Sequence, residues 1–209
     1  MIASAESPRT AAALSEEDAV RASFYALLAR LFCAPPDAAL LEALAGAGDL
    51  GDASGELGAA WKALADAARN TDAGAARDAY DRLFIGVGRP EIMLYGSYYQ
   101  AGFMMEKPLA LLRDDLAELG LARVAGVNEP EDHFAALAEV MRTLVSDPAL
   151  EEGDRASAQE RFFDRHIAPW YGKLAGALER SPEAGFYAVA GRFARAFLDI
   201  ERMSFEIQP

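Results

Sequence analysis

Apolar residues recur every three to four positions over most of the chain, which is the period of an amphipathic helix. The first such segment begins at Ser15, a good N-cap with Asp18 three residues later, and ends before Pro35-Pro36. Further helices are expected over 37–45, 61–68, 75–84, 108–119, 157–166 and 182–200. Residues 1–13 are small and polar and are expected to form a mobile tail, followed by one all-helical domain over 14–209.

The strongest apolar stripe follows Asn128. Asn128 can cap a helix, and Glu131, three residues later, completes a capping pair. The pattern therefore predicts a helix from about 128, with a buried face made of Phe134, Leu137, Ala138, Met141, Leu144 and Val145. No segment shows a convincing strand alternation or an Asn-Gly hairpin signal, so the predicted fold class is all-α, a compact single-domain helical bundle.

The helical pattern breaks between residues 85 and 95. Gly86, Gly88 and Pro90 lie within five positions, which predicts an ordered loop between two helical blocks. Gly86-x-Gly88 does not make a nucleotide fingerprint, because no strand precedes it and the third glycine is missing.

Composition limits the functions that the chain can have. The 209 residues carry a formal net charge of −13 and contain no cluster of lysine and arginine, which argues against nucleic-acid binding. The acidity has two interpretations, a solvated surface or the attraction of a basic partner. No apolar run is long enough to cross a bilayer, and the N-terminus does not resemble a secretory signal, so cytoplasmic residence is expected. The single cysteine, Cys33, follows an apolar run and is expected to be buried.

The segment 129–133 gathers three carboxylates and one of two histidines. His133 with Glu129 or Asp132 could serve a metal-assisted hydrolase, although no His-x-x-x-His pair exists to complete a site. Acidic residues in a first helical turn are also ordinary capping residues. A third interpretation is recognition, in which an exposed Asp132–His133 pair accepts the arginines of a bound peptide.

Tyrosines and methionines cluster after the breaker-rich loop. Core packing is their first interpretation and an adaptable peptide groove the second, and they are Met93, Tyr95, Tyr98, Tyr99, Phe103, Met104 and Met105. Ser97 does not lie in a Gly-x-Ser-x-Gly motif, and the sequence offers no persuasive catalytic residues.

Five motifs occur in a specific order. They are Tyr80-x-x-Leu83-Phe84, Ser97-Tyr98-Tyr99, the leucine-rich segment from Pro108 to Gly120, Glu129-Pro130-Glu131-Asp132-His133, and Phe162-x-x-x-His166-x-x-Pro169-Trp170. With these motifs the chain resembles the TorD/DmsD family of chaperones for molybdenum-containing redox enzymes. One departure is Leu94-Tyr95-Gly96, which replaces a Pro-x-x-Ser segment of many relatives.

The resemblance implies a cytoplasmic, non-enzymatic chaperone, without a cofactor or metal, that binds an apo-molybdoenzyme catalytic subunit or its twin-arginine signal peptide before export. It implies a monomer or a swapped dimer, with no nucleic-acid partner and no stable membrane insertion. The peptide site that it implies comprises Asp132, His133, Glu129, Pro130, Tyr80, Ser97, Tyr98 and Tyr99. The alternatives are the metal-assisted hydrolase and a structural adaptor that binds a folded partner.

Overall fold

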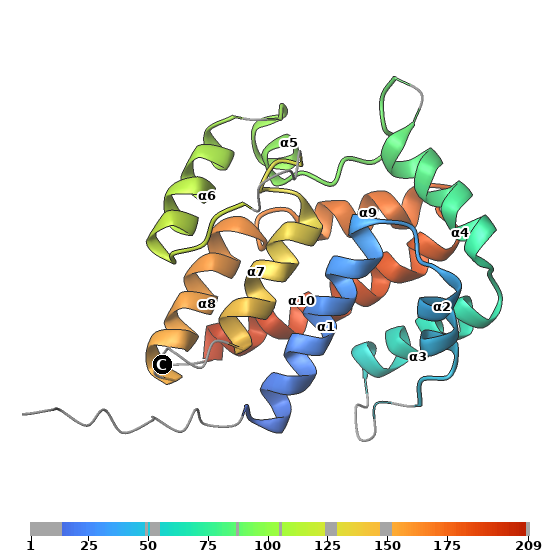
Figure 1. Ribbon diagram of the computed structural model, residues 1–209, viewed down its shortest axis with the longest axis horizontal. Coiled ribbons are helices and arrows are strands. Elements are labelled where there is room, and N and C mark those ends of the chain that lie inside the picture. The colour runs from blue at the N-terminus through green and yellow to red at the C-terminus, as the bar shows by residue number, and fades with distance from the viewer. Residues whose placement is uncertain are drawn as a thin grey trace, which may run out of the picture.

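A computed structural model describes residues 14–48, 50, 55–86, 88–104, 106–123, 129–146 and 152–207. In these residues the chain forms α-helices and one π-helical turn and no strand, which confirms the all-α prediction (Figure 1). In chain order the elements are α1 (Glu16–Cys33), α2 (Ala38–Ala45), α3 (Glu56–Arg69), α4 (Ala73–Tyr80), η1 (Asp81–Ile85), α5 (Gly96–Ala101), α6 (Lys107–Glu118), α7 (Phe134–Ser146), α8 (Glu152–His166), α9 (Tyr171–Arg180) and α10 (Phe186–Ile207).

Local capping explains several helix starts. The Ser15 side chain accepts the N–H of Asp18 at 3.0 Å, and Asp37 accepts the N–H of Leu40 at 2.8 Å, so both helices begin where the sequence predicts. The predicted helix over 75–84 is observed as α4 followed by η1. The expected tail, residues 1–13, and the predicted cap Asn128 lie outside the described residues.

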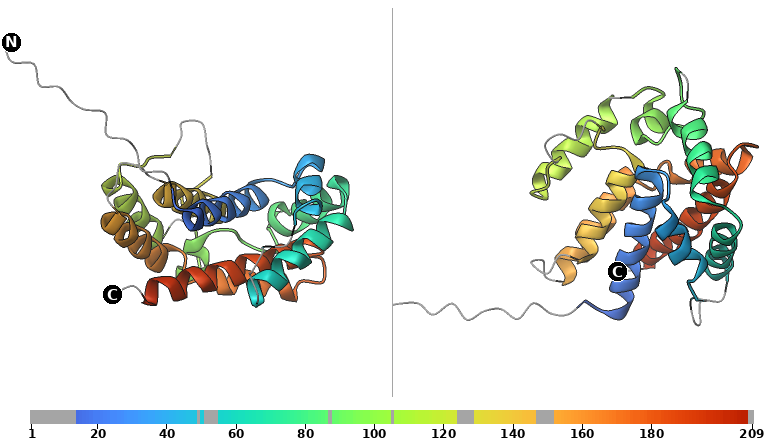
Figure 2. Two further views of the ribbon diagram at one scale, coloured as in Figure 1. Left: turned by 90° about the horizontal axis from the view of Figure 1, so that it is seen from below. Right: turned by 45° about the vertical axis from the view of Figure 1, so that its right-hand side comes forward.

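The helices enclose a single hydrophobic core. Helices α1 and α7 lie side by side, while α10 extends along the opposite side and packs against α3 and α9 (Figure 2). All six predicted residues of the α7 stripe are buried. Among the described helices, none is long and apolar enough to cross a membrane.

A buried ion pair fastens α1 to α10. The Arg21 guanidinium donates to both carboxylate oxygens of Glu201 at 2.8 and 2.9 Å, and the Tyr25 hydroxyl donates to Glu201 at 2.9 Å. Arg21 also donates to Gln159 of α8 at 2.8 Å. With Glu201 only 2% exposed, these bonds satisfy a charge that would otherwise be costly to bury.

Several predicted helix boundaries were wrong. Helix α7 begins at Phe134 rather than near 128, and α8 begins at Glu152 rather than 157. Helices α5 and α9 were not predicted, and α10 runs from Phe186 to Ile207 rather than from 182 to 200. Helix α9 follows directly on Pro169-Trp170 and contains two glycines, so the local pattern favoured a break there.

Candidate functional site

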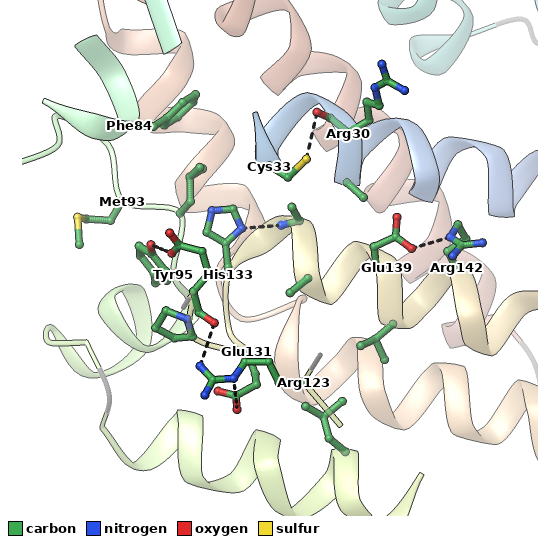
Figure 3. A pocket seen from close by; sticks show the side chains of 18 of the residues that line it. Arg30, Cys33, Phe84, Met93, Tyr95, Arg123, Glu131, His133, Glu139 and Arg142 are labelled. Atoms are coloured by element: carbon green, nitrogen blue, oxygen red, sulfur yellow. Dashed lines mark hydrogen bonds and ion pairs between the residues drawn. The ribbon is translucent and has the colours of Figure 1, made fainter. Parts of the chain in front are cut away.

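A cleft of about 830 Å³ lies over the contact between α1 and α7 (Figure 3). Helices α1 and α7 form its floor. The walls come from the junction of α4 with η1, from the loop before α5, from the end of α6 with residues 121–123, and from residues 129–133 before α7. It is lined by Ala26, Ala29, Arg30, Cys33, Tyr80, Phe84, Ile85, Pro90, Ile92, Met93, Leu94, Tyr95, Leu116, Leu121, Ala122, Arg123, Glu129, Pro130, Glu131, His133, Ala135, Ala136, Glu139, Val140, Arg142 and Thr143.

Most of this lining is apolar. The floor consists largely of small side chains, including Ala29 and Ala136, which allow a bound chain to approach the helices closely. Larger apolar side chains stand at the walls, among them Phe84 and Ile85, and Ile85 is 59% exposed. An apolar cavity of this size with a few polar groups at its edge is typical of a binding site.

Glu129 and Tyr95 form a polar pair at one end of the cleft. The Tyr95 hydroxyl donates a hydrogen bond to the Glu129 carboxylate. Burial and this bond raise the pKa of Tyr95 well above its ordinary value, so its phenol stays protonated. Glu129 is exposed, and within the described part of the chain it forms no ion pair. Its carboxylate is therefore positioned by Tyr95 and open to a cation from outside.

His133 lines the same end of the cleft but is 8% exposed. Its Nδ1 accepts the N–H of Ala135 at 3.2 Å, which places the ring's proton on Nε2. Burial lowers the pKa of His133, an effect that outweighs the nearby Glu129 and Asp132. The imidazole is thus neutral at physiological pH and caps α7, so it offers the cleft no positive charge.

Asp132 lies behind the cleft wall rather than in it. The side chain is 4% exposed, and its Oδ2 accepts the N–H of Ser97 at 2.7 Å. Two backbone bonds join the same segments, from Gly96 to the carbonyl of Asp132 at 3.0 Å and from Phe134 to the carbonyl of Leu94 at 2.8 Å. The expectation of an exposed Asp132–His133 pair is therefore wrong, because Asp132 fastens the start of α5 to the start of α7.

Packing of Trp170 adds to these hydrogen bonds between the start of α5 and the start of α7. Trp170 is fully buried and donates from Nε1 to the carbonyl of His166 at 2.6 Å. Gly96 lies against its indole, since a Cβ there would come within 2.9 Å of Nε1. The Tyr99 ring stacks on Trp170 with 5.3 Å between ring centroids. We call Gly96, Ser97, Asp132 and Trp170 the clamp, and note that three of the five sequence motifs meet in it.

An ion pair and a hydrogen bond hold α6 near the cleft. Arg113 of α6 donates to Glu131 at 2.9 Å, and Asp115 of α6 contacts His166 of α8 at 2.6 Å. Burial lowers the pKa of His166 more than Asp115 raises it, whereas the hydrogen bonds from His166 and Arg165 lower the pKa of Asp115 despite its burial. A neutral His166 therefore donates from Nε2 to an ionised Asp115.

The cleft contains four of the eight residues expected in the peptide site, namely Tyr80, Glu129, Pro130 and His133. The other four do not line it. Asp132 and Ser97 are buried in the clamp, Tyr99 packs on Trp170, and Tyr98 accepts a hydrogen bond from Arg89 at 3.1 Å.

The residues of α1 and α7 that form the floor were not predicted from the sequence. These positions lie just beside the buried stripes and look like ordinary helix surface in the sequence. Tyr95 did have a signal in the sequence, because it belongs to the cluster of aromatic residues and methionines for which a peptide groove was one interpretation. Cys33 was expected to be buried but is exposed and lines the cleft.

No three His, Cys, Asp or Glu side chains converge to form a metal site in the residues that the structure describes. The carboxylates around His133 do not converge on it: Glu129 accepts a hydrogen bond from Tyr95, Glu131 pairs with two arginines, and Asp132 accepts the N–H of Ser97. This arrangement gives the metal-assisted hydrolase no support.

The chain is similar to a known protein family and to several curated proteins that share one name. Residues 51–176 match the family model described as nitrate reductase delta subunit. The chain is 29% identical over 126 residues to a protein of Vibrio cholerae serotype O1 named chaperone protein TorD, a match that covers 57% of each chain. Proteins of the same name from Photobacterium profundum and Aliivibrio salmonicida are 25% and 24% identical over 126 and 127 residues, covering 57% and 56% of this chain and 58% of each relative.

The match thus spans somewhat more than half the length of these curated relatives. The family-model match over residues 51–176 includes η1, the clamp's Gly96, Ser97, Asp132 and Trp170, and much of the cleft. Because the family model covers more than half of the sequence, the chain belongs to the nitrate reductase delta subunit family, and the names of its curated relatives confirm the resemblance to TorD-like chaperones.

Proposed function

We propose that this protein is a chaperone for a molybdenum-containing redox enzyme and that it holds a segment of that client in the α1–α7 cleft. Its family and the names of its curated relatives support the chaperone role. The segment best suited to the cleft is a twin-arginine signal peptide, in which basic residues precede an apolar stretch. Binding would take place in the cytoplasm, before the client is exported.

The observation that carries this proposal is the pairing of an apolar cleft with one uncompensated carboxylate. The apolar floor, including Ala29, Ala136 and Val140, would cover the hydrophobic part of the peptide and remove it from water. Glu129 stands at the end of that floor, held by Tyr95, and can accept an arginine in a bidentate, charge-assisted pair.

This assignment moves the recognition of arginine from Asp132 to Glu129. Asp132 is buried and already accepts the Ser97 N–H, so it would have to break the clamp to reach a ligand. Glu129 needs no such rearrangement, because it is exposed at the cleft. His133 would contribute an uncharged wall and an Nε2–H donor rather than a charge.

Calorimetry with a synthetic peptide tests the proposal. The peptide carries two adjacent arginines followed by an apolar stretch, and the wild-type protein should bind it with a measurable dissociation constant. Glu129→Gln should weaken binding by roughly two- to tenfold, since a partly exposed arginine–carboxylate pair contributes about 0.2–1 kcal/mol and a bidentate pair somewhat more. The fold should be unchanged by circular dichroism.

Glu118→Gln is the matched control. Glu118 is an exposed residue at the end of α6, outside the cleft lining, and its substitution removes the same charge. It should bind the peptide as the wild type does. No detectable binding by the wild-type protein, or equal loss in both variants, would contradict a specific role of this cleft in holding the client.

A further inference from the structure

The charges that line the cleft are distributed unevenly along it. Tyr95, Glu131 and His133 lie at one end, with Glu129 hydrogen-bonded to Tyr95, while Arg30, Glu139 and Arg142 lie toward the other (Figure 3). The first end combines two carboxylates with Arg123, and the second combines two guanidinium groups with the carboxylate of Glu139. We call these the acidic end and the basic end after the groups that line them, although Glu131, Arg30 and Arg142 each already form an ion pair.

At the acidic end, the two carboxylates differ in their partners. Glu131 already pairs with Arg113 at 2.9 Å and with Arg123 at 3.9 Å, and these arginines help to lower its pKa although its burial opposes ionisation. Glu129 has no cationic partner among the described residues. The negative charge available to a ligand at this end thus comes from Glu129.

At the basic end, each arginine keeps donors in reserve. Arg30 donates from one terminal nitrogen to Asp37 at 2.9 Å, and Arg142 donates from Nε to Glu139 at 2.7 Å. A guanidinium has five N–H donors, so both groups can still bind a second carboxylate. The Asp37 carboxylate is itself shared with the N-cap of α2, where it accepts the N–H of Leu40.

The axis of α7 gives the approximate separation of the two ends, because His133 of the acidic end directly precedes the first residue of that helix. Arg142 is eight residues beyond Phe134, the first residue of α7, and therefore about 12 Å along the helix axis. The floor between the two ends is apolar and includes Ala29, Ala136 and Val140. About eight residues of a helical ligand would span that distance, so one ligand can contact both ends at once.

We propose that the Arg30–Arg142 end is a subsite for a carboxylate of the bound client segment. The inference rests on the proposed function, because it takes the cleft to be the peptide site. The bound segment then runs in one direction, with its basic residues on Glu129, its apolar stretch over α1 and α7, and an acidic side chain at Arg142 or Arg30. This charge pattern would distinguish a client from other peptides that are merely basic and apolar.

Two synthetic peptides test the subsite. Both carry an arginine pair, eight apolar helix-forming residues and one final polar residue, which is aspartate in the first and asparagine in the second, with amidated C-termini. Calorimetry should show that the wild-type protein binds the aspartate peptide about two- to fivefold more tightly, which corresponds to about 0.4–1 kcal/mol and lies within the range for an exposed charge pair. The difference should shrink as salt is raised.

Arg142→Glu should abolish or invert this preference. Arg69→Glu is the matched control, because Arg69 forms a similarly exposed ion pair three residues away on its own helix, with Asp66, and does not line the cleft. It should retain the wild-type preference. A photo-crosslinker on the final residue of the aspartate peptide should label the C-terminal half of α7 rather than residues 129–133.

The possible failures are distinct. If the wild-type protein binds both peptides equally well, or if Arg142→Glu keeps the preference for aspartate, the carboxylate subsite is wrong while the cleft remains a peptide site. If crosslinks map to residues 129–133, the direction is wrong. If the wild-type protein binds neither peptide, the proposed function falls, and the subsite falls with it.

Discussion

The Asp132 carboxylate accepts the backbone N–H of Ser97 at 2.7 Å and is buried behind the cleft. The bond holds the first turn of α5 against the segment that leads into α7, a separation of 35 residues in sequence. Its other oxygen, Oδ1, is buried and has no hydrogen-bond partner in the described structure. Asp132 is thus a structural residue within a motif whose composition suggests ligand binding.

Asp132→Ala should destabilise the protein by about 1–3 kcal/mol, because it leaves the buried Ser97 N–H without this acceptor. Asp132→Asn should cost less, since its amide oxygen can still accept that N–H. Urea unfolding followed by circular dichroism gives the free energies. Where both variants are folded, they should bind the arginine-containing peptide close to wild type, in contrast to Glu129→Gln. A folded Asp132→Asn that has lost binding would return Asp132 to the binding site.

Gly96→Ala should destabilise the fold by about 1–3 kcal/mol, the usual cost of forcing atoms into a packed core. The added Cβ would lie 2.9 Å from Nε1 of Trp170 and 3.2 Å from Cε2, and Trp170 is fixed by its bond to His166. Gly172→Ala in α9 is the control, because a Cβ there meets nothing within 4 Å. That variant should be as stable as the wild type or slightly more so. Equal stabilities of the two variants would refute the proposed clash.

Arg21→Met should lower the free energy of unfolding by about 3–5 kcal/mol, since it leaves Glu201 buried without its cationic partner. Arg69→Met, which breaks the exposed pair with Asp66, should cost at most about 1 kcal/mol. Thermal and urea unfolding of both variants measure the difference. Similar losses in the two variants would mean that the Arg21–Glu201 pair contributes no more than an exposed pair.

Stability should fall when the pH is lowered through about 6.5. Burial lowers the pKa of both His133 and His166 in the folded state, so the unfolded chain takes up these protons first. The loss begins near the unfolded pKa of 6.5 and is complete below the folded values, with at most about 1.4 kcal/mol per pH unit for each histidine. Urea unfolding at pH 7.5 and 5.5 measures it. A His166→Gln variant should show a smaller difference between the two pH values, and an unchanged difference would exclude His166 as a contributor.

Cys33 should react in the folded protein. It is the single cysteine and is exposed in the cleft, although partial burial raises its pKa. A thiol reagent should therefore label one site per chain without denaturant, more slowly than a free thiol, and the rate should rise with pH. Bound peptide should slow the labelling further. Labelling that requires urea would contradict the exposed position of Cys33.

The fold class followed from the sequence because helical periodicity is a local property. The stripe of α7 and the caps Ser15 and Asp37 are all decided within a few residues of chain. The prediction that Cys33 is buried was wrong because it relied on an apolar run rather than on helical periodicity. Leu28 and Phe32 lie on the buried face of α1, and one residue further the helix has turned Cys33 toward the cleft.

The start of α7 could not be read from its own residues. The capping pair of Asn128 and Glu131 favours an early start, but residues 94–96 form backbone bonds with residues 132–134 and hold that segment outside the helix. Contacts of this kind join distant parts of the chain and have no local signal. The motifs therefore identified the region of the site. Which of their side chains face the cleft depends on how α5 and Trp170 pack, and that packing has no local signal.

The clamp and the cleft share a wall but use different side chains, since Gly96, Ser97, Asp132 and Trp170 face inward while Glu129, Arg30 and Arg142 face the ligand side. The outward set can therefore be rewritten without disturbing the scaffold. Under the function proposed above, new charges grafted onto α1 and α7 would redirect the cleft to a different peptide.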